Sequence, residues 1–375
     1  ERKRSKADLI KCEWRSNRLQ KKASWFSCPG CDRMVTGLVC QGHPHPERHE
    51  TYSYSHCCLC CERGEKIHAA WWYCAGVPKK MLRSVTLKTG KEQHYILHDP
   101  GGRGSRPVLL FLHGASTYIY PELLHWDIHD LQENSVVREF IILAPFGSIG
   151  EPVVNSQKKL KSDRFYNMVP YVKCFDPDIL WDFFMSALKD LGNDGNSEKR
   201  FDPARLHVTG YSLGGQATWA LSCFYGSCLA SAAPMAAKCA WEEDSWDHGA
   251  KILQELRHLP VWTYACKWDF TAFSHEDHWW IAEHRDLDIY GKEVEVLTEG
   301  SVHGVCHQWS EDLTLTLLQG TPSHHNAWAP VLHNEKAFGV FTRMLSRKCE
   351  NPPSMEGDER CEGRYPHTKL TSALA

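Results

Sequence analysis

The chain has 375 residues, of which 42% are hydrophobic, and a formal net charge of −3. This length suits one large domain and a smaller one. The small net charge gives no reason to expect nucleic acid or an anionic membrane as the main partner. No apolar run approaches the roughly 18 residues that a transmembrane helix needs. The first residue is Glu1, which leaves a preceding targeting segment open.

Cysteine is unevenly distributed along the chain. Nine of the 17 cysteines lie between Cys12 and Cys74, and the others are scattered without the spacing of a disulfide framework. We expect the scattered cysteines as far as Cys306 to be free thiols, several of them buried, which favours a reducing compartment such as the cytoplasm. The scattered positions are Cys174, Cys223, Cys228, Cys239, Cys266, Cys306, Cys349 and Cys361.

The N-terminal region differs in composition from the rest of the chain. Residues 1–22 are basic and polar, which predicts a flexible segment. Residues 23–80 are rich in cysteine and histidine and poor in aliphatic side chains, so a module of this size would need a bound metal to fold. The C-x-x-C pair of Cys28 and Cys31 encloses Pro29-Gly30, which suits a tight turn around a metal.

Two tetrahedral sets of soft ligands can be drawn in this module, and zinc prefers such sets. The sets are Cys28, Cys31, Cys40 with His43, and Cys58, Cys61, His68 with Cys74. The residues that compete with them as ligands are Cys57, Cys60, His45, His49 and His56. Disulfide bonds and a segment without fixed structure are the alternatives to zinc. Any zinc here would be structural, and the module is a candidate site for a protein partner.

From residue 81 to residue 345 the pattern is that of an α/β domain, followed by a flexible tail over residues 346–375. Continuous apolar runs such as residues 108–112 are typical of parallel strands covered on both faces. Strands are predicted at residues 84–87, 94–97, 108–112, 140–145, 206–208, 231–236 and 260–265, with 293–297 as a further candidate and 313–317 as an outer strand. Helices are predicted at residues 123–131, 179–191, 216–224 and 335–345. This alternation predicts a doubly wound, mostly parallel sheet.

The segment Gly210-Tyr211-Ser212-Leu213-Gly214 matches the pattern G-x-S-x-G between a predicted strand and a predicted helix. So sharp a turn forces strained backbone at the serine and requires small neighbours, which Gly210 and Gly214 supply. The turn would lift the Ser212 hydroxyl above the sheet edge and aim the helix N-terminus at an oxyanion formed there. We interpret Ser212 as a nucleophile; the alternative is a glycine-rich turn with a surface serine.

A serine nucleophile needs a base and an orienting carboxylate, and parallel sheets carry such groups at the carboxyl ends of their strands. The motif implies that the acid follows the serine in the chain and that the histidine comes last. Asp269 follows the strand predicted at residues 260–265, so it is the predicted acid. The carboxylates that fit less well are Glu276, Asp277, Asp286 and Asp288.

The sequence defines the histidine less sharply. His303 would lie in the loop after the candidate strand at residues 293–297, whereas His324 and His325 follow the strand at residues 313–317. We favour His325 as the base, with His303 and His324 as the alternatives. A histidine that serves only to hold a loop by hydrogen bonds is the other role for each of them.

These segments together resemble the phospholipase/carboxylesterase-like and "predicted peptidase" branch of the α/β-hydrolases, over about residues 82–345. Residues 202–219 are similar to that family's nucleophile segment, D-x-x-R-(L/I/V)-x-x-T-G-x-S-M-G-G-x-x-(T/A)-W. Residues 108–115 are similar to its L-L-x-F-L-H-G-A strand and loop, and Ala144-Pro145 to its A-P strand end. Residues 260–269 resemble its acid strand, and residues 325–328 its H-(D/N)-x-W motif.

The resemblance implies an α/β-hydrolase fold and a catalytic triad of Ser212, Asp269 and His325. It also implies an oxyanion hole formed by the main-chain N–H groups of Leu213 and of the loop carrying Gly114 and Ala115. The chain departs from the family in its Cys-rich N-terminal region and in a long stretch, rich in tryptophan and histidine, between Asp269 and residue 313.

We therefore expect a serine hydrolase that cleaves small-molecule carboxylic esters through an acyl-enzyme, with no cofactor for the chemistry. A serine peptidase on the same fold would use the same triad, so the residues do not discriminate between the two activities. A third hypothesis is a non-catalytic binding protein with a degenerate hydrolase domain.

Overall fold

The computed structural model describes residues 81–102, 104–114, 128, 131, 134–146, 177–192, 200–238, 254–269, 275–297, 302–321 and 325–354, together with short strands in the N-terminal region. The chain divides into two compact units. The first consists of Glu1–Arg83 with Ile119–His129, and the second of Ser84–Tyr118 with Asp130–Ala375.

The first unit contains short antiparallel strands. Strand β1 (Ile10–Lys11) pairs with β4 (Glu50–Thr51), and β2 (Trp25–Ser27), β3 (Arg33–Thr36) and β5 (Val77–Pro78) form a three-stranded sheet. The predicted zinc ligands and most of the predicted flexible segment at residues 1–22 lie outside the described residues. Both expectations therefore stay predictions.

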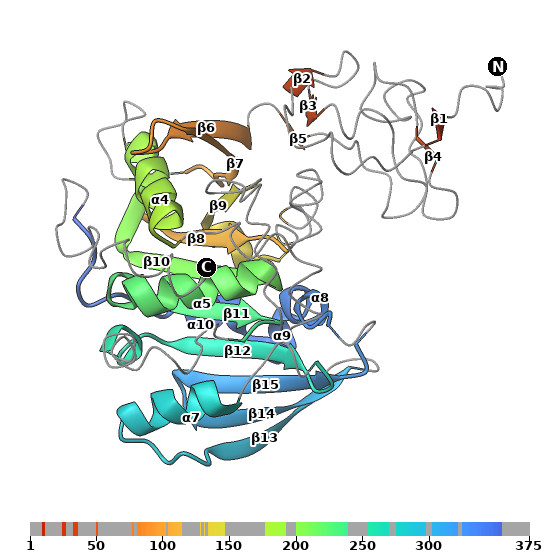
Figure 1. Cartoon of the computed structure of the whole chain (residues 1–375), viewed down its shortest axis with the longest axis vertical. Helices are drawn as coiled ribbons and strands as arrows, with labels where there is room; N and C mark the ends of the chain where they lie inside the picture. Colours follow the sequence, from red (N-terminus) through yellow and green to blue (C-terminus); the bar gives the residue numbers. More distant parts are fainter. Residues whose placement is uncertain are drawn as a thin grey trace, which may run out of the picture. The chain divides into compact units, whose positions relative to one another are not determined.

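A ten-stranded sheet organises the rest of the chain, in the order β13-β14-β15-β12-β11-β10-β8-β9-β7-β6 (Figure 1). Its strands are β6 (Leu82–Thr86), β7 (Glu92–His98), β8 (Arg106–Leu112), β9 (Ile141–Pro145), β10 (Phe201–Tyr211), β11 (Ser231–Met235), β12 (Val261–Cys266), β13 (Lys292–Leu297), β14 (His303–Ser310) and β15 (Leu313–Gln319). The six strands in the middle of this order, β9-β8-β10-β11-β12-β15, each pair in parallel with their neighbours within that set. Strand β7 pairs antiparallel with β9, and β14 pairs antiparallel with both β13 and β15. The predicted α/β class and mostly parallel sheet are confirmed.

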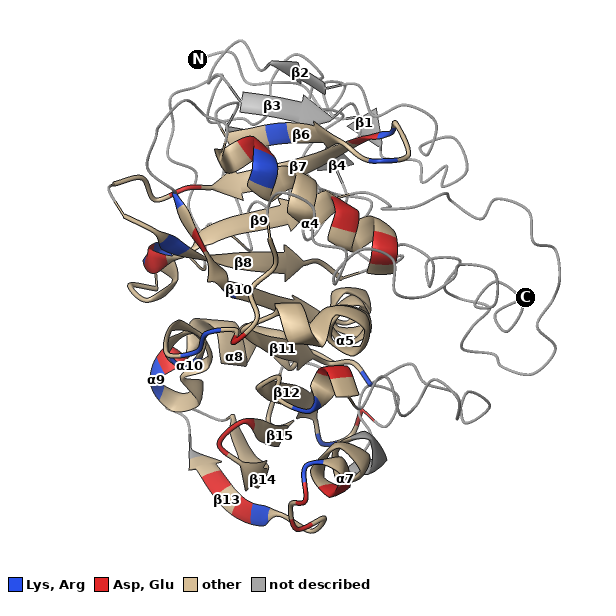
Figure 2. Ribbon diagram, turned by 90° about the vertical axis from the view of Figure 1, so that its left-hand side faces the viewer, with Lys and Arg blue, Asp and Glu red and all other residues tan. Residues whose placement is uncertain are grey.

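The apolar runs form the centre of the sheet because both of its faces are covered. In β8, the side chains from Val108 to Leu112 have no solvent exposure, and every residue of β12 is buried. Helices cover the two faces: α4 (Pro177–Gly192), α5 (Leu213–Tyr225) and α7 (His275–His284) lie on one side and α9 (Glu335–Phe338) and α10 (Val340–Leu345) on the other (Figures 1 and 2). Burying large side chains on both faces supplies most of the driving force for this fold.

Helix α4 begins at Pro177, because proline tolerates the first helical position, where no intrahelical N–H bond is needed. Its apolar side chains face the core, and Trp181 stacks on Tyr225 of α5 with 4.7 Å between ring centroids and an interplanar angle of 8°. The predicted helix over residues 123–131 lies largely outside the described residues.

The C-terminal part of the sheet differs from the prediction. Strand β15 is an inner strand between β12 and β14, and it is buried. Its alternating threonines mimic an exposed face, but Thr316 is paired in register with Cys306 of β14 and is 3% exposed. The pattern does not predict strand β14, which contains His303 where the sequence indicates a loop. The outer strand is β13, where charged residues alternate and discourage edge-to-edge pairing (Figure 2).

The end of the chain also differs from the prediction. Gly339, with φ of 59°, divides the predicted last helix into α9 and α10. The predicted flexible tail is wrong for its first residues, because Cys349 donates its N–H to Ala204 O at 2.7 Å and its thiol contacts Ser227 O at 3.1 Å. Residues 355–375 lie outside the described residues. Arg347 forms an ion pair with Asp312 at 2.6 Å. Arg347 and Cys349 thus join this segment to β10, to the 3-10 turn Gly226–Cys228 that follows α5, and to the turn between β14 and β15.

The thiol prediction is wrong for one residue. Cys223, Cys266 and Cys306 are free and buried, as expected, but Cys228 is disulfide-bonded. The scattered spacing gave no signal of this bond. A disulfide is typical of an oxidising compartment, so the scattered cysteines no longer favour the cytoplasm.

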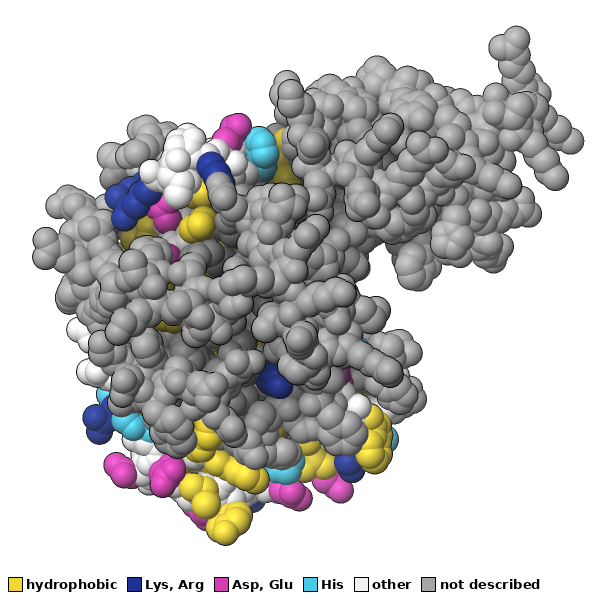
Figure 3. All heavy atoms as spheres, viewed as in Figure 1, with side chains coloured by type: hydrophobic (Ala, Val, Ile, Leu, Met, Phe, Trp, Pro, Cys, Tyr) yellow, Lys and Arg dark blue, Asp and Glu magenta, His cyan; other side chains and the backbone are white. Residues whose placement is uncertain are grey.

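Exposed large hydrophobic side chains of the described residues fall within one stretch. They are Trp268, Trp279, Trp280, Ile289, Tyr290 and Val294. Figure 3 shows hydrophobic side chains gathered on the part of the second unit that carries α7 and β13. Among the described helices, none is both long and apolar enough to cross a membrane.

Candidate active site

Ser212 lies in the turn between β10, which ends at Tyr211, and α5, which begins at Leu213. Its backbone has φ of 54° and ψ of −118°, a conformation that non-glycine residues rarely adopt. The strain is held by hydrogen bonds from both sides: Ser212 N–H donates to Met235 O of β11 at 2.9 Å, and Gln216 N–H donates to Ser212 O at 3.0 Å. Strand, tight turn and helix follow one another as the motif requires.

Two glycines make the turn possible by their lack of a side chain. A Cβ atom on Gly214 would lie 2.1 Å from Leu112 O, and one on Gly210 would lie 2.6 Å from the same oxygen. Both obstacles are backbone atoms and cannot rotate away. The prediction that these two positions must be small is confirmed.

The structure brings Ser212, Asp269 and His325 together at the carboxyl ends of strands β10, β12 and β15. Strand β12 ends at Cys266, and Asp269 follows in a turn in which its N–H donates to Cys266 O at 3.0 Å. His325 follows β15, and its Nδ1 is hydrogen-bonded to Asp269 Oδ2. Its Nε2 lies 2.9 Å from Ser212 Oγ. When Nδ1–H donates to the carboxylate, Nε2 carries no proton and can accept the one on the Ser212 hydroxyl.

The carboxylate and the imidazole have different exposures. The Asp269 side chain is 8% exposed, whereas that of His325 is 45% exposed. A buried carboxylate needs a hydrogen-bond partner, and the His325 ring supplies one. The exposed side of the ring leaves access for a substrate or a water molecule.

The predicted oxyanion donors are described in part. Leu213 is the first residue of α5, where N–H groups have no intrahelical acceptor. Gly114 lies beside the serine, because a Cβ atom on it would be 3.5 Å from Ser212 Cβ. Ala115 lies outside the described residues.

His113 fixes the start of the loop that carries Gly114. Its ring is fully buried, and Nδ1 is 2.8 Å from Gly114 O, to which it can donate. Burial lowers the pKa of His113 to about 4, and the bond to the Gly114 carbonyl opposes that shift only in part. The imidazole is therefore neutral near pH 7, and its hydrogen bond tethers the loop next to Ser212.

The other candidate acids and histidines are less well placed. His303 is the exposed first residue of β14, opposite Gln319. Asp288 follows α7 and accepts a hydrogen bond from Tyr290 N–H at 3.0 Å. Asp286 ends the turn after α7 with φ of 56°. The remaining candidates, which are His324 and the side chains of Glu276 and Asp277, lie outside the described residues.

Residues 326–328 support the histidine in ways that sequence reasoning missed. Asn326 Oδ1 accepts a hydrogen bond from Ala329 N–H at 3.1 Å, and Ala327 is fully buried. Trp328 begins α8 (Trp328–His333) and stacks on Tyr211. The segment His325-Asn-Ala-Trp328 indicates that these residues belong to the site, but it does not reveal which residue the tryptophan contacts.

In the described part of the chain, no group of three or more His, Cys, Asp or Glu side chains could hold a metal ion. The eight predicted zinc ligands are not among those residues.

Comparisons with known proteins give distant likenesses. No family model matches the sequence, and no curated protein matches it either. One similar solved structure is a thermostable esterase, with 16% identity and a TM-score of 0.42 over 72% of this chain and 64% of that one. Another is an acetyl xylan esterase from Aspergillus awamori, with 12% identity and a TM-score of 0.44 over 69% of this chain and 98% of that one. The match thus covers less than two thirds of the thermostable esterase. At this level of similarity, the activities of these esterases cannot be assigned to this chain.

Proposed function

We propose that the chain is a serine hydrolase of the α/β-hydrolase type that cleaves small-molecule carboxylic esters, with Ser212 as nucleophile, His325 as base and Asp269 as orienting acid. The observation that carries the proposal is the continuous hydrogen-bonded series from Asp269 Oδ2 through the His325 ring to Ser212 Oγ. The strained backbone of Ser212 supports it, because such strain costs free energy and is retained mostly at functional sites, the turn of a nucleophilic serine among them.

The reaction begins with transfer of the Ser212 proton to His325 Nε2 as Oγ attacks the ester carbonyl. The N–H groups of Leu213 and of the loop at Gly114 and Ala115 stabilise the tetrahedral oxyanion, and each such donor contributes about 3 kcal/mol. His325 then protonates the leaving alcohol, which leaves the acyl group on Ser212. In the second half it activates a water molecule that hydrolyses the acyl-enzyme. Asp269 holds the ring in the required tautomer and stabilises the imidazolium.

The first prediction concerns Ser212. Ser212→Ala removes the nucleophile, so the rate of p-nitrophenyl acetate hydrolysis should fall by a factor of at least about 1,000. Reaction of the wild-type protein with a fluorophosphonate should label Ser212. The matched control is Ser222→Ala on α5, where Ser222 Oγ only donates to Thr218 O at 2.7 Å, and it should keep the wild-type rate. Equal rates for wild type and Ser212→Ala would refute the proposal.

The same variants separate the alternatives. A peptidase would turn over a peptide amide faster than the matched ester, whereas the proposed esterase shows the reverse order. A folded wild-type protein that reacts with neither the ester nor the fluorophosphonate would favour the binding-protein hypothesis. Structural zinc at residues 23–80 and a protein partner for that region remain separate predictions, because the proposed chemistry draws only on the residues named above.

A further inference from the structure

An aromatic stack joins the nucleophile turn to the histidine loop. The ring of Trp328 lies on that of Tyr211, with 4.5 Å between centroids and an interplanar angle of 16°. Tyr211 directly precedes Ser212 and is 5% exposed. A contact between these two rings therefore connects the residue next to the nucleophile with the first residue of α8.

Trp328 also touches the base. The centroid of its ring is 5.5 Å from that of His325, and the two planes meet at 79° in an edge contact. Only two residues separate His325 from Trp328, and both are fixed: Ala327 N–H donates to His325 O at 3.0 Å, and Asn326 Oδ1 accepts from Ala329 N–H. The tryptophan is thus fixed by the chain on both sides of it, in edge contact with the imidazole.

The stack reaches the oxyanion loop as well. A Cβ atom on Gly114 would lie 2.6 Å from Tyr211 Cε2, so the tyrosine ring lies directly against that loop. Phe111 of β8 also lies near this ring, tilted by 59° with 6.2 Å between centroids. The ring of Tyr211 thus contacts Trp328, just after the catalytic histidine, on one side and lies against Gly114 of the oxyanion loop on another.

We propose that Trp328 is a positioning residue that, through its stack on Tyr211 and its edge contact with His325, holds the imidazole at hydrogen-bond distance from Ser212. The inference rests on the proposed function and adds to it a residue that does not touch the reacting atoms. His325 needs such support because its side chain is 45% exposed and Asp269 fixes only one of its ring nitrogens.

The test is Trp328→Leu with Trp328→Phe beside it, both measured on p-nitrophenyl acetate. Leucine removes both ring contacts, so kcat should fall by about 10- to 100-fold while KM changes by less than about 2-fold. Phenylalanine keeps a ring on Tyr211 and should restore kcat to within about 3-fold of the wild type. The matched control is Trp181→Leu, since Trp181 makes a similar tryptophan–tyrosine stack on Tyr225, between α4 and α5. It should lower the unfolding temperature without lowering kcat.

A double-variant comparison separates positioning from a structural role. If Trp328 acts through His325, adding Trp328→Leu to His325→Ala should leave the residual rate unchanged. An equal loss in both backgrounds, or an unchanged kcat in Trp328→Leu alone, would overturn the inference while the proposed function stands. A wild-type protein without esterase activity and without fluorophosphonate labelling would overturn both.

Discussion

Ser212 occupies a backbone conformation that costs of order 1–3 kcal/mol, and its neighbours must hold it there. Gly210 and Gly214 do so by allowing β8, β10 and α5 to approach more closely than any side chain would permit. The sequence predicted this arrangement because only small residues fit it. It also indicated Asp269 and His325, since each follows a strand that ends at the same edge of the sheet.

Other features of the site depend on contacts that residue types do not encode. The stack of Trp328 on Tyr211 joins residues more than a hundred positions apart, and nothing in the spacing predicts that pair. The same holds for His113, whose bond to the carbonyl of the next residue depends on the path of the loop. The motifs thus indicate which residues form the site, whereas the residues that hold them in place can be identified only from the structure.

The second prediction tests the packing at the turn. Gly214→Ala places a Cβ atom 2.1 Å from Leu112 O, so the turn must shift and move Ser212 away from His325. We expect esterase activity to fall by about 100-fold or more, because displacements near 1 Å have effects of that size. The free energy of unfolding, measured in urea, should fall by about 2–4 kcal/mol.

The control for this prediction is Gly192→Ala at the end of α4. A Cβ atom there would meet only Phe201 Cε1 at 4.0 Å, an ordinary contact. Activity and stability should stay close to those of the wild type. A Gly214→Ala variant that behaves like Gly192→Ala would show that the turn tolerates a side chain, contrary to the packing argument.

At the scale of elements, the buried parallel strands were predictable because their apolar runs admit few other interpretations. The hairpin β13-β14 was only half predicted, since β14 mixes histidine, glutamine and serine with apolar residues. Its partly polar pattern is satisfied locally: His307 faces Glu293 of β13 at 3.4 Å, and Trp309 Nε1 donates to Ile289 O at 2.8 Å. A single-sequence pattern cannot reveal such pairings before the register is known.

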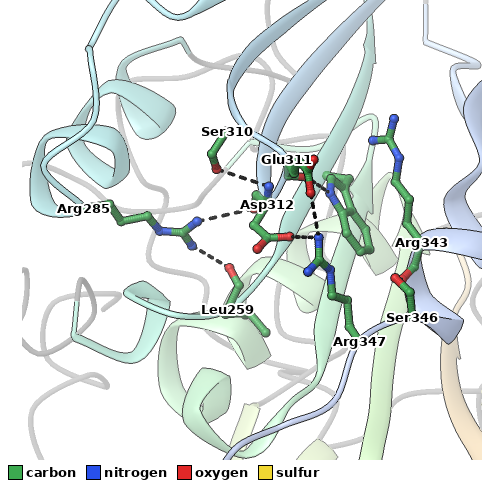
Figure 4. A network of polar contacts seen from close by, with 9 residues as sticks. Leu259, Arg285, Ser310, Glu311, Asp312, Arg343, Ser346 and Arg347 are labelled. Atoms are coloured by element: carbon green, nitrogen blue, oxygen red, sulfur yellow. Dashed lines mark hydrogen bonds and ion pairs between the residues drawn. The ribbon is translucent and has the colours of Figure 1, made fainter.

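A polar network, shown in Figure 4, joins several elements around the start of β12. Asp269 follows the other end of this strand, so the network and the triad lie at opposite ends of it. Arg285, just after α7, donates to Leu256 O and Leu259 O at 2.5 Å each and to Asp312 O at 3.3 Å. Asp312 in turn pairs with Arg347, and Trp262 Nε1 donates to Glu311 O at 2.8 Å. The network thus fastens α7, the β14–β15 turn and the segment after α10 around the start of β12.

The third prediction is that Arg285→Met destabilises the fold without affecting the chemistry. Burial lowers the pKa of Arg285 to about 10, so the guanidinium is still charged at neutral pH. Removing it takes away the donor to Leu256 O and Leu259 O, whereas Asp312 O keeps the N–H of Val261, and the loss should cost about 3 kcal/mol of the free energy of unfolding in urea. The value of kcat should not change, because Ser212, Asp269 and His325 follow the carboxyl ends of their strands.

The matched control is Arg257→Met, since Arg257 is an exposed arginine between Leu256 and Leu259, the two residues whose carbonyls Arg285 binds. Surface substitutions of this kind change stability by less than about 0.5 kcal/mol. Equal unfolding free energies for the two variants would contradict the structural role of the network, and a fall in kcat confined to Arg285→Met would contradict its separation from the site.

For the whole molecule, buried neutral histidines set how stability responds to acid. His207, on β10 between neighbouring strands, has no solvent exposure, and its Nδ1 lies 2.8 Å from Ser231 Oγ. Burial, followed by repulsion from Arg205, lowers the pKa of His207 to about 3 despite the opposing charge of Asp202. Burial likewise lowers the pKa of His113 to about 4. Both rings are uncharged in the folded protein at neutral pH.

The fourth prediction follows from proton linkage. Above about pH 6.5 these histidines are neutral in both the folded and the unfolded chain, so they do not make the free energy of unfolding depend on pH. As the pH falls below 6.5, the unfolded chain binds protons that the folded chain cannot, until the pH reaches about 4 for His113 and about 3 for His207. Over that window each histidine should reduce the free energy of unfolding by up to about 1.4 kcal/mol per pH unit.

Urea unfolding at pH 7, 6, 5 and 4.5 measures this dependence, and one pair of variants assigns it. His207→Phe combined with Ser231→Ala removes both members of a buried hydrogen bond, so no polar atom of the pair is left unsatisfied. Below pH 6.5 the free energy of unfolding of the double variant should fall less steeply than that of the wild type. The difference in slope should be that of one histidine, up to about 1.4 kcal/mol per pH unit. The control, His258→Asn at an exposed position, should follow the wild-type slope. Since the slope is compared and the absolute stability is not, any repacking around the introduced phenylalanine ring does not affect the result. Parallel slopes for all three proteins would mean that His207 accepts a proton in the folded state, which its burial between strands argues against.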